Sequence, residues 1–231
     1  KEQAKGVTLE PETLIALATT LYYRAQWTDQ FNKSNTKPDT FHGSDGDVTC
    51  DFLHQSGTDN YFWGDKFSAV AQSLGNSGSM WFFRPEDGET PEALLQDKQV
   101  QKLLTHPDGW KQTKYLTIHR SIPKFDVASD LDLQESLRTL GITDVFDRKK
   151  ADFSPLTQDK QPAYLSQAKH AARVTIDEDG CTAAAFTVMS VDAMSAPPAE
   201  EVDFVLDRPF LFVLTGADGS PLFVGIVRQP A

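Results

Sequence analysis

The sequence predicts an α+β protein in which strands and helices follow one another irregularly. Apolar runs typical of strands, such as residues 79–84 and 115–127, are separated by stretches with helical spacing at about 91–104 and 130–140. There is no regular strand–helix alternation and no internal repeat, so α+β is the class. The 231 residues, 39% of them hydrophobic, can bury the core of one large domain or of two small ones.

The first half of the chain contains one ambiguous segment and two clearer ones. Residues 14–23 mix Thr, Tyr and Ile with small apolar residues, which fits either a buried strand or a short helix. Residues 79–84 form an apolar run that ends at turn-forming residues, and this predicts a strand. Thr90 offers an N-cap oxygen and Pro91 suits the first helical position, so we expect a helix over about 91–104.

The second half adds a long strand, a helix and a hairpin. Residues 115–127 alternate aliphatic and polar side chains, which predicts a strand with an edge or a bend at its internal proline. Asp130 can cap a helix whose leucines recur near helical spacing until Gly141, a typical C-terminal residue. The apolar runs 210–214 and 222–227 flank a segment rich in Gly and Asp, as in a hairpin.

Composition excludes several classes of function. The 22 basic and 33 acidic residues give a net charge of −11, which argues against binding to nucleic acid. No apolar run reaches the length of a membrane span, and the first residues have no signal peptide, although one can precede residue 1. Cys50 and Cys181 are expected to be free thiols, and the five scattered histidines show no metal-binding spacing, so neither a metal nor a cofactor is expected.

Residues 177–202 do not fit a packed domain. The stretch contains a run of small residues and then a Pro-Pro pair followed by acids, with no core-facing pattern near its end. Connections of this length inside compact domains are usually functional or disordered, and a flexible linker is the simpler alternative. Residues 181–191 are small or compatible with a strand, so the segment can also enter a sheet. Alternation would place Cys181 and Ala183 on one face and Phe186 on the other.

Motifs spread over nearly the whole chain resemble those of the serpin family, in the family's order. They are Leu21 to Trp27 (LYYRAQW), Ser121 to Phe125 (SIPKF), Leu137 to Ile142 (LRTLGI) with Phe146 and Ala151 to Phe153, His170, Glu178 to Thr187 (EDGCTAAAFT), and Asp207 to Phe210 (DRPF) with Leu222 to Gly225 (LFVG). Each motif is weak alone, whereas the set in register is specific.

The resemblance implies a fold and a function. It identifies residues 1–231 as the C-terminal portion of a single serpin domain, with large mixed sheets, surrounding helices and an exposed reactive loop at about 178–202. The N-terminal part of that fold, which is not present in this chain, is an expected partner. Serpins are inhibitors and not enzymes: a serine protease attacks the loop, the loop then inserts into the large sheet, and the acyl-enzyme is trapped. The family implies an extracellular location.

The family's spacing places the bait bond between Met194 and Ser195. An unbranched apolar residue at this point suits a protease with a hydrophobic or small primary pocket, of the elastase, chymotrypsin or subtilisin type. The same resemblance assigns the hinge and inserting strand, which comprise Glu178, Asp179, Gly180, Cys181, Thr182, Ala183, Ala184, Ala185 and Thr187.

Departures from the family pattern keep an alternative open. Cys181 stands where the family usually has Thr or Ser, and Thr182 stands where it often has Glu. The alternative is a non-inhibitory serpin that acts in binding, storage or folding assistance and whose loop is cut as an ordinary substrate. A hydrolase is disfavoured, because the sequence has no Gly-x-Ser-x-Gly elbow and no signature that joins a cysteine to a base.

Overall fold

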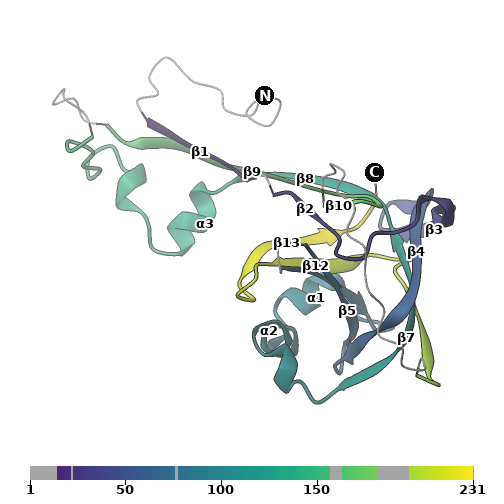
Figure 1. Ribbon diagram of the computed structural model, residues 1–231. Coiled ribbons are helices and arrows are strands. Elements are labelled where there is room, and N and C mark those ends of the chain that lie inside the picture. Colours follow the sequence, from purple (N-terminus) through teal and green to yellow (C-terminus); the bar gives the residue numbers. More distant parts are fainter. Residues whose placement is uncertain (1–14, 22, 76–77, 157–162, 182–197, 231) are drawn as a thin grey trace. The chain divides into compact units, whose positions relative to one another are not determined.

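The computed structural model describes most of the chain, in two compact units. The described residues are 15–21, 23–75, 78–156, 163–181 and 198–230. The first unit comprises Lys1–Tyr22 and Ala128–Arg173, and the second comprises Tyr23–Val127 and Val174–Ala231. Strands dominate and short helices accompany them (Figure 1), so the predicted α+β class is confirmed.

A five-stranded sheet is built around β9 (Leu165–Ile176). β9 pairs in parallel with β1 (Ile15–Leu21), and it also pairs with β8 (Phe125–Asp132). At Ile176 it pairs with the two-residue strand β10 (Gly180–Cys181), which pairs in turn with β2 (Ala25–Gln26). The ambiguous segment 14–23 therefore contains a strand.

The other sheet has eight strands and lies wholly in the second unit. Its order is β11-β7-β4-β5-β6-β12-β13, with β3 added beside β4. The predicted strand at 79–84 and the predicted C-terminal hairpin are both confirmed. The strands are β3 (Lys37–Gly43), β4 (Gly46–Trp63), β5 (Phe67–Ser73), β6 (Ser79–Pro85), β7 (Thr113–Pro123), β11 (Glu201–Val205), β12 (Phe210–Thr215) and β13 (Pro221–Val227).

The predicted strand over residues 115–127 is two strands. β7 ends at Pro123 and β8 begins at Phe125. The break follows the proline, which has no N–H to donate to a neighbouring strand. The N–H of Lys124 donates instead to the carbonyl of Asp51, 2.8 Å away. The predicted bend at the proline is confirmed, whereas the prediction of one continuous strand is wrong.

The predicted helix at 91–104 is also interrupted. α1 (Pro91–Leu95) begins as expected, with the Thr90 hydroxyl accepting from the N–H of Ala93 at 3.2 Å. It ends at Gln96, and α2 (Lys98–Thr105) starts anew because the Asp97 carboxylate caps the N–H of Gln99 at 2.6 Å. Asp97 is a typical N-cap residue, but the apolar residues continue past it with helical spacing, so the sequence predicted one helix and not two.

The helix predicted from Asp130 starts later in the structure. Asp130 belongs to β8, and α3 spans Gln134–Thr139. The N–H of Leu133 donates to the carbonyl of Ala168 in β9 at 2.8 Å, and this contact keeps the preceding residues extended. Gly141 has φ of +88°, so its predicted C-terminal position is confirmed.

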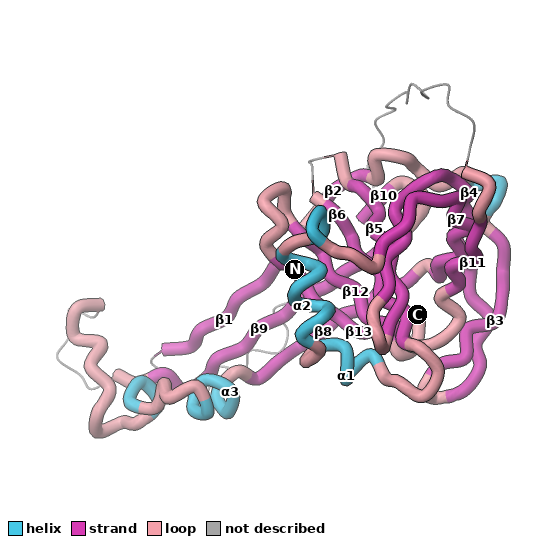
Figure 2. Tube along the Cα trace, turned by 90° about the horizontal axis from the view of Figure 1, so that it is seen from below, coloured by secondary structure: helices cyan, strands magenta, loops and turns pink. Residues whose placement is uncertain are grey.

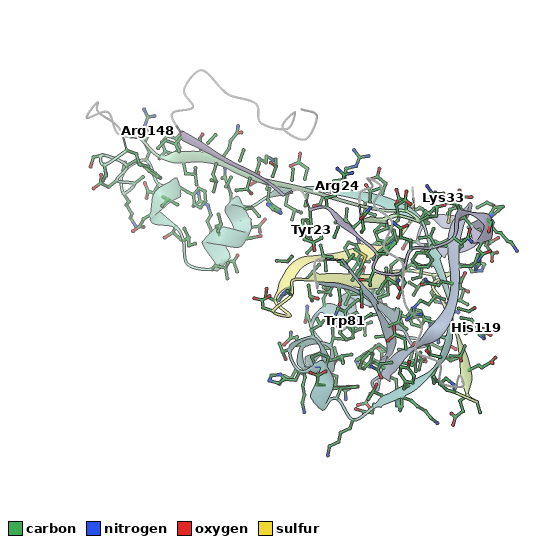
Figure 3. All side chains as sticks on the ribbon, in the orientation of Figure 1. Tyr23, Arg24, Lys33, Trp81, His119 and Arg148 are labelled. Carbon is green, nitrogen blue, oxygen red and sulfur yellow. The ribbon has the colours of Figure 1, made fainter. Side chains whose placement is uncertain are left out.

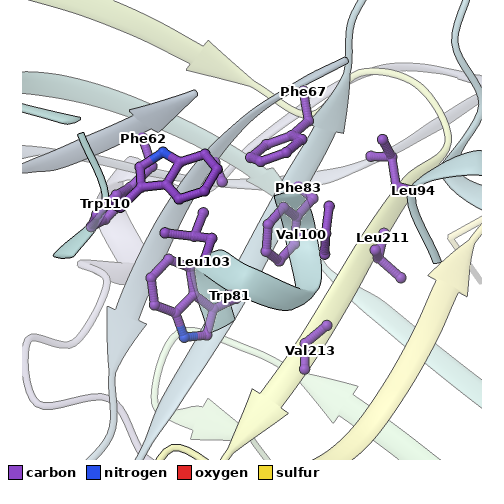
Figure 4. Packing of buried hydrophobic residues seen from close by; sticks show 11 residues of the cluster. Phe62, Phe67, Trp81, Phe83, Leu94, Val100, Leu103, Trp110, Leu211 and Val213 are labelled. Atoms are coloured by element: carbon purple, nitrogen blue, oxygen red, sulfur yellow. The ribbon is translucent and has the colours of Figure 1, made fainter. Parts of the chain in front are cut away.

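One core fills the space between α1, α2 and the eight-stranded sheet. Leu94, Val100 and Leu103 of the helices face aromatic side chains of β5 and β6 (Figure 4), and all are buried. The other face of the sheet is covered by phenylalanine rings, including Phe82, Phe210 and Phe125. None of the helices in the described ranges has the length and apolar composition needed to cross a bilayer.

The first unit has a smaller core of its own. Phe146, Leu165 and Ala168 are buried there, and α3 contributes Leu137. The guanidinium of Arg138 lies 4.8 Å from the centre of the Phe146 ring. The quoted block from Leu137 to Phe153 is thus a packing motif of this unit.

Candidate functional site

The candidate site is the loop base, residues 177–181, which joins β9 to the segment that the sequence predicts to be the reactive loop. Its turn is closed by Asp177, whose carboxylate accepts from the N–H groups of Asp179 at 2.9 Å and Gly180 at 3.0 Å. The N–H of Asp177 donates to the carbonyl of Gly180 at 3.0 Å. These bonds hold β10 antiparallel to the end of β9.

The chain that follows β2 holds the backbone of the loop base. The N–H of Trp27 donates to the carbonyl of Asp179 at 3.2 Å, and the N–H of Phe31 donates to that of Glu178 at 3.0 Å. The indole N–H of Trp27 donates to the carbonyl of Asp177 at 2.8 Å. Because Trp27 is only 2% exposed, these hydrogen bonds are shielded from water. They hold the backbone of residues 177–179 in place at the point where the chain leaves the sheet.

The Glu178 carboxylate is the best-enclosed charge of the loop base. Its side chain is 11% exposed, and it accepts from the Thr36 hydroxyl at 2.8 Å and pairs with the Lys124 ammonium at 3.2 Å. Burial by itself would raise the pKa of Glu178. Hydrogen bonds from its own N–H, from Thr36 and from Lys124 outweigh burial, so the pKa lies below its ordinary value and the carboxylate is charged at neutral pH.

A second ion pair joins Asp179 to Lys33, at 3.1 Å. The Lys33 side chain, which is labelled in Figure 3, is 69% exposed, whereas that of Lys124 is 33% exposed. Its hydrogen bond to Asp179 raises the pKa of Lys33. Exposed pairs contribute little stability and are screened by salt, so Glu178 is the stronger anchor.

Gly180 and Cys181 are confined by β2. Gly180 has φ of +155°, and a Cβ at this position would lie 2.3 Å from the carbonyl oxygen of Ala25, so only glycine fits. Cys181 is 2% exposed, and burial, with a smaller effect of Asp177, raises the pKa of its thiol to about 11. The structure therefore accommodates cysteine as a small buried residue.

The pairing of β1 with β9 is reinforced by a side-chain contact. Thr19 lies opposite His170, and the Thr19 hydroxyl and the Nδ1 atom of His170 are hydrogen-bonded at 2.8 Å. The two strands are in register from Ala16 to Leu21 against Gln167 to Ala172. His170 stood out in the sequence as part of a motif.

The structure brings together four of the predicted site residues, Glu178, Asp179, Gly180 and Cys181. The other predicted residues lie outside the described part of the chain: Thr182, Ala183, Ala184, Ala185, Thr187, Met194 and Ser195. Sequence reasoning missed the anchors Phe31, Lys33 and Thr36, which are more than 140 residues away from the loop base. Lys124 was seen only as part of a strand motif, and no local signal links it to Glu178.

The described residues contain no group of three His, Cys, Asp or Glu side chains placed to hold a metal ion. Cys50 and Cys181 are both free thiols. In the loop base, the short strand β10 pairs with β9 on one side and with β2 on the other. Ion pairs of the preceding residues Glu178 and Asp179 hold it in this position.

Comparison with known proteins identifies the family. The model of the family described as "Serpin (serine protease inhibitor)" matches residues 1–230. Plasminogen activator inhibitor 1 of Sus scrofa is 34% identical over 230 residues, which cover 94% of this chain and 54% of the relative. Human glia-derived nexin is 30% identical, over 94% of this chain and 55% of the relative. The chain thus spans about half the length of these relatives.

Solved structures agree with this fold. The native state of tengpin, a thermophilic serpin, superposes with a TM-score of 0.80 at 24% identity, over 96% of this chain and 57% of the other. Native protease nexin-1 with heparin gives 0.71 at 28% identity, over 92% and 56%. From the sequence match along nearly its whole length and from this likeness of fold, the chain belongs to the serpin family.

Proposed function

We propose that this chain carries the trapping machinery of a serine protease inhibitor, in which cleavage between Met194 and Ser195 allows the loop to extend β10 into the five-stranded sheet. The observation that carries the proposal is the position of β10. Its two residues already pair with β9 on one side and with β2 on the other. The first step of strand insertion is therefore built into the uncut protein.

Extension of β10 has a defined register. Cys181 pairs antiparallel with Ile176, so each further loop residue would pair with the preceding residue of β9. Residues 185–192 would then lie opposite Ala172 back to Leu165, which β1 occupies now. Insertion along β9 therefore requires β1 to separate from β9 and to pair with the new strand instead.

The free energy available from insertion is large. About a dozen new backbone hydrogen bonds at roughly 0.5–1.5 kcal/mol each, together with side-chain burial, give on the order of 10 kcal/mol. Met194 lies 13 residues beyond Cys181, so in the inserted strand Met194 and the attached protease would lie roughly 43 Å from Cys181 along the sheet. That displacement supports a mechanism in which the protease is dragged from the loop and distorted.

Two further aspects of the function follow from the residues. The unbranched apolar side chain of Met194 favours a target with a hydrophobic or small primary pocket, as in elastase-, chymotrypsin- or subtilisin-like enzymes. Membership of the serpin family implies an extracellular site of action.

The proposal is tested by mixing the purified protein with one protease of each type. We expect a covalent complex that survives denaturing electrophoresis, and a released C-terminal peptide that begins at Ser195 in mass spectrometry. Simple cleavage without a complex for all three proteases would contradict the proposal. Cleavage at another bond would move the bait position but leave the trapping mechanism in place.

A further inference from the structure

We propose that Asn32 is a site of N-linked glycosylation, at which an oligosaccharide is transferred to the side-chain amide from a lipid-pyrophosphate carrier. The inference goes beyond the proposed trapping function. It takes from that function only the extracellular location, since this modification belongs to secreted proteins.

The sequence contains the acceptor pattern at one place. Asn32, Lys33 and Ser34 form Asn-x-Ser with a residue other than proline in the middle, which is the pattern that the transfer requires. The chain has three other asparagines, at positions 35, 60 and 76, and none of them is followed two residues later by Ser or Thr. Because a pattern of three residues also arises by chance, the surroundings of Asn32 decide whether it can carry a glycan.

The two ends of the pattern are hydrogen-bonded to each other. The Ser34 hydroxyl donates to the Oδ1 atom of Asn32 at 2.8 Å, and the Ser34 N–H donates to the same oxygen at 3.0 Å. Both bonds engage the acceptor side of the amide. The Nδ2 atom, which is the atom that receives the sugar, is hydrogen-bonded to none of the described residues, and Asn32 is exposed to water.

Asn32 is exposed at a point where the backbone is anchored. The residue before it, Phe31, is 4% exposed, and its N–H donates to the carbonyl of Glu178 at 3.0 Å. Asn32 and Ser34 lie on the connection between β2 and β3, which Figure 2 draws mainly as loop, with one short helical turn at Lys33–Asn35. A glycan is bulky and hydrated, so a folded protein can carry it only at an exposed position of this kind.

The transfer is a substitution at the first carbon of the sugar. A bond forms between the Nδ2 atom of Asn32 and that carbon, and the bond between the carbon and the pyrophosphate oxygen breaks. The lipid pyrophosphate leaves with the electron pair, and the amide nitrogen loses one proton to a base of the transferring enzyme. No oxidant or reductant takes part, and the secreting cell supplies both the donor and the enzyme.

A glycan on Asn32 would stand beside the loop base. Lys33 is the next residue, and its ammonium group pairs with Asp179 at 3.1 Å. The Lys33 side chain is 69% exposed and suits the acidic primary pocket of trypsin-like proteases. A hydrated oligosaccharide on the preceding residue covers the peptide bond after Lys33. The glycan therefore protects the segment that holds the loop base from proteases that the Met194 bait does not suit.

Mass spectrometry of the protein purified from the cells that naturally secrete it tests the modification. A peptide N-glycosidase acting in heavy-oxygen water converts a glycosylated asparagine to labelled aspartate, so we expect the label at Asn32 and at no other asparagine. The glycan should be released from the native protein as completely as from the denatured one, because Asn32 is exposed. An unlabelled Asn32 would overturn the proposal.

Variants expressed behind a signal peptide in cultured animal cells identify the groups that the transfer needs. Asn32→Gln and Ser34→Ala should each abolish the shift in electrophoretic mobility that the glycosidase causes, whereas Ser34→Thr should retain it. Asn35→Gln is the matched control, because it changes an exposed asparagine three residues away and should leave the shift in place. A shift that survives Asn32→Gln, or one that is lost in Asn35→Gln, would contradict the assignment.

The protective role is measured on the native protein with and without its glycan. Trypsin should cleave after Lys33 severalfold faster once the glycan has been removed, and equal rates would overturn the protection.

The trapping assay separates this proposal from the proposed function. A glycan on Asn32 without any covalent protease complex would remove the inhibitory mechanism and retain the glycosylation site. A covalent complex formed by a protein whose Asn32 is unmodified in its natural source would remove the site and leave the inhibitory mechanism intact.

Discussion

Glu178 is the residue on which the loop base depends most. It stands at the end of β9, enclosed by groups from the chain after β2 and from the junction of β7 and β8. Its Thr36 and Lys124 partners satisfy a carboxylate that would otherwise be costly to bury. The neighbouring Asp179 forms an ion pair with Lys33 at the surface. This pair is weaker than that of Glu178 because it is more exposed to water.

Glu178→Gln should lower the free energy of unfolding by about 1–2 kcal/mol, because a half-buried ammonium group loses its counter-charge. Urea unfolding at neutral pH measures this, with Asp45→Asn as the matched control at an exposed turn. The same loss for both variants would mean that the Lys124 pair contributes nothing specific.

The pH dependence of this difference has a definite sign. The folded pKa of Glu178 lies below its ordinary value of 4.5, so the carboxylate contributes stability above that pH. The advantage of the wild type over Glu178→Gln should therefore be complete above about pH 5 and should shrink as the pH falls through the lowered pKa. An advantage that grows in acid would contradict the assignment.

At the scale of elements, β9 pairs with three strands, β1, β8 and β10. Its first part pairs with β1 and its last residue pairs with β10. The proposed switch is an exchange along one strand, in which the loop takes the place of β1 beside β9. The Thr19–His170 hydrogen bond lies on the path of that exchange, and Gly180 is the point at which the path begins.

Two neighbouring substitutions test the register of this exchange. In the proposed inserted strand, alternation would place Ala183 on the same face as Cys181, which is buried in the structure, and Ala184 on the opposite face. Ala183→Arg should impair insertion, because a charged side chain would enter the packed side, and most of the protein should be consumed as a substrate. Ala184→Arg should retain more of the trapping.

Titration of a fixed amount of protease measures the number of inhibitor molecules consumed for each enzyme molecule trapped. We expect the number of inhibitor molecules consumed to rise severalfold more for Ala183→Arg than for Ala184→Arg. The reverse order would place the other face of the loop toward the core.

At the scale of the whole molecule, the proposed mechanism requires that the uncut state is not the most stable arrangement of the chain. The chain has a net charge of −11 and presents acids at both ends of its loop, at Glu178 and Asp179 and again at Glu200 and Glu201. Cleavage changes only one covalent bond. Any large change in stability after cleavage must therefore come from new strand pairing.

Cleavage within the loop should raise the midpoint of thermal unfolding by more than 10 °C, since about 1 kcal/mol shifts a domain of this size by roughly 2–4 °C. Differential scanning calorimetry before and after a brief exposure to a subtilisin-like protease measures the change. An unaltered midpoint would favour the non-inhibitory alternative, in which the loop is an ordinary substrate.

The sequence by itself determined the class, the family, some of the strands and two helix ends, because these depend on local patterns such as the apolar run at 79–84 and the caps at Thr90 and Gly141. It failed where a distant contact overrides a local preference. Asp130 was expected to start a helix and instead lies in β8, and the stripe at 91–104 conceals a second cap at Asp97.

Only the tertiary structure decided how the loop base is held. Thr36, Lys33 and Lys124 reach Glu178 and Asp179 across 54 to 146 residues, and no periodicity or spacing encodes such contacts. The strand character of residues 14–23 was settled in the same way, by a partner strand about 150 residues away. Sheet pairing joins backbone groups irrespective of their distance along the chain. The contacts of the loop base and the strand at residues 14–23 could therefore be identified only from the folded structure.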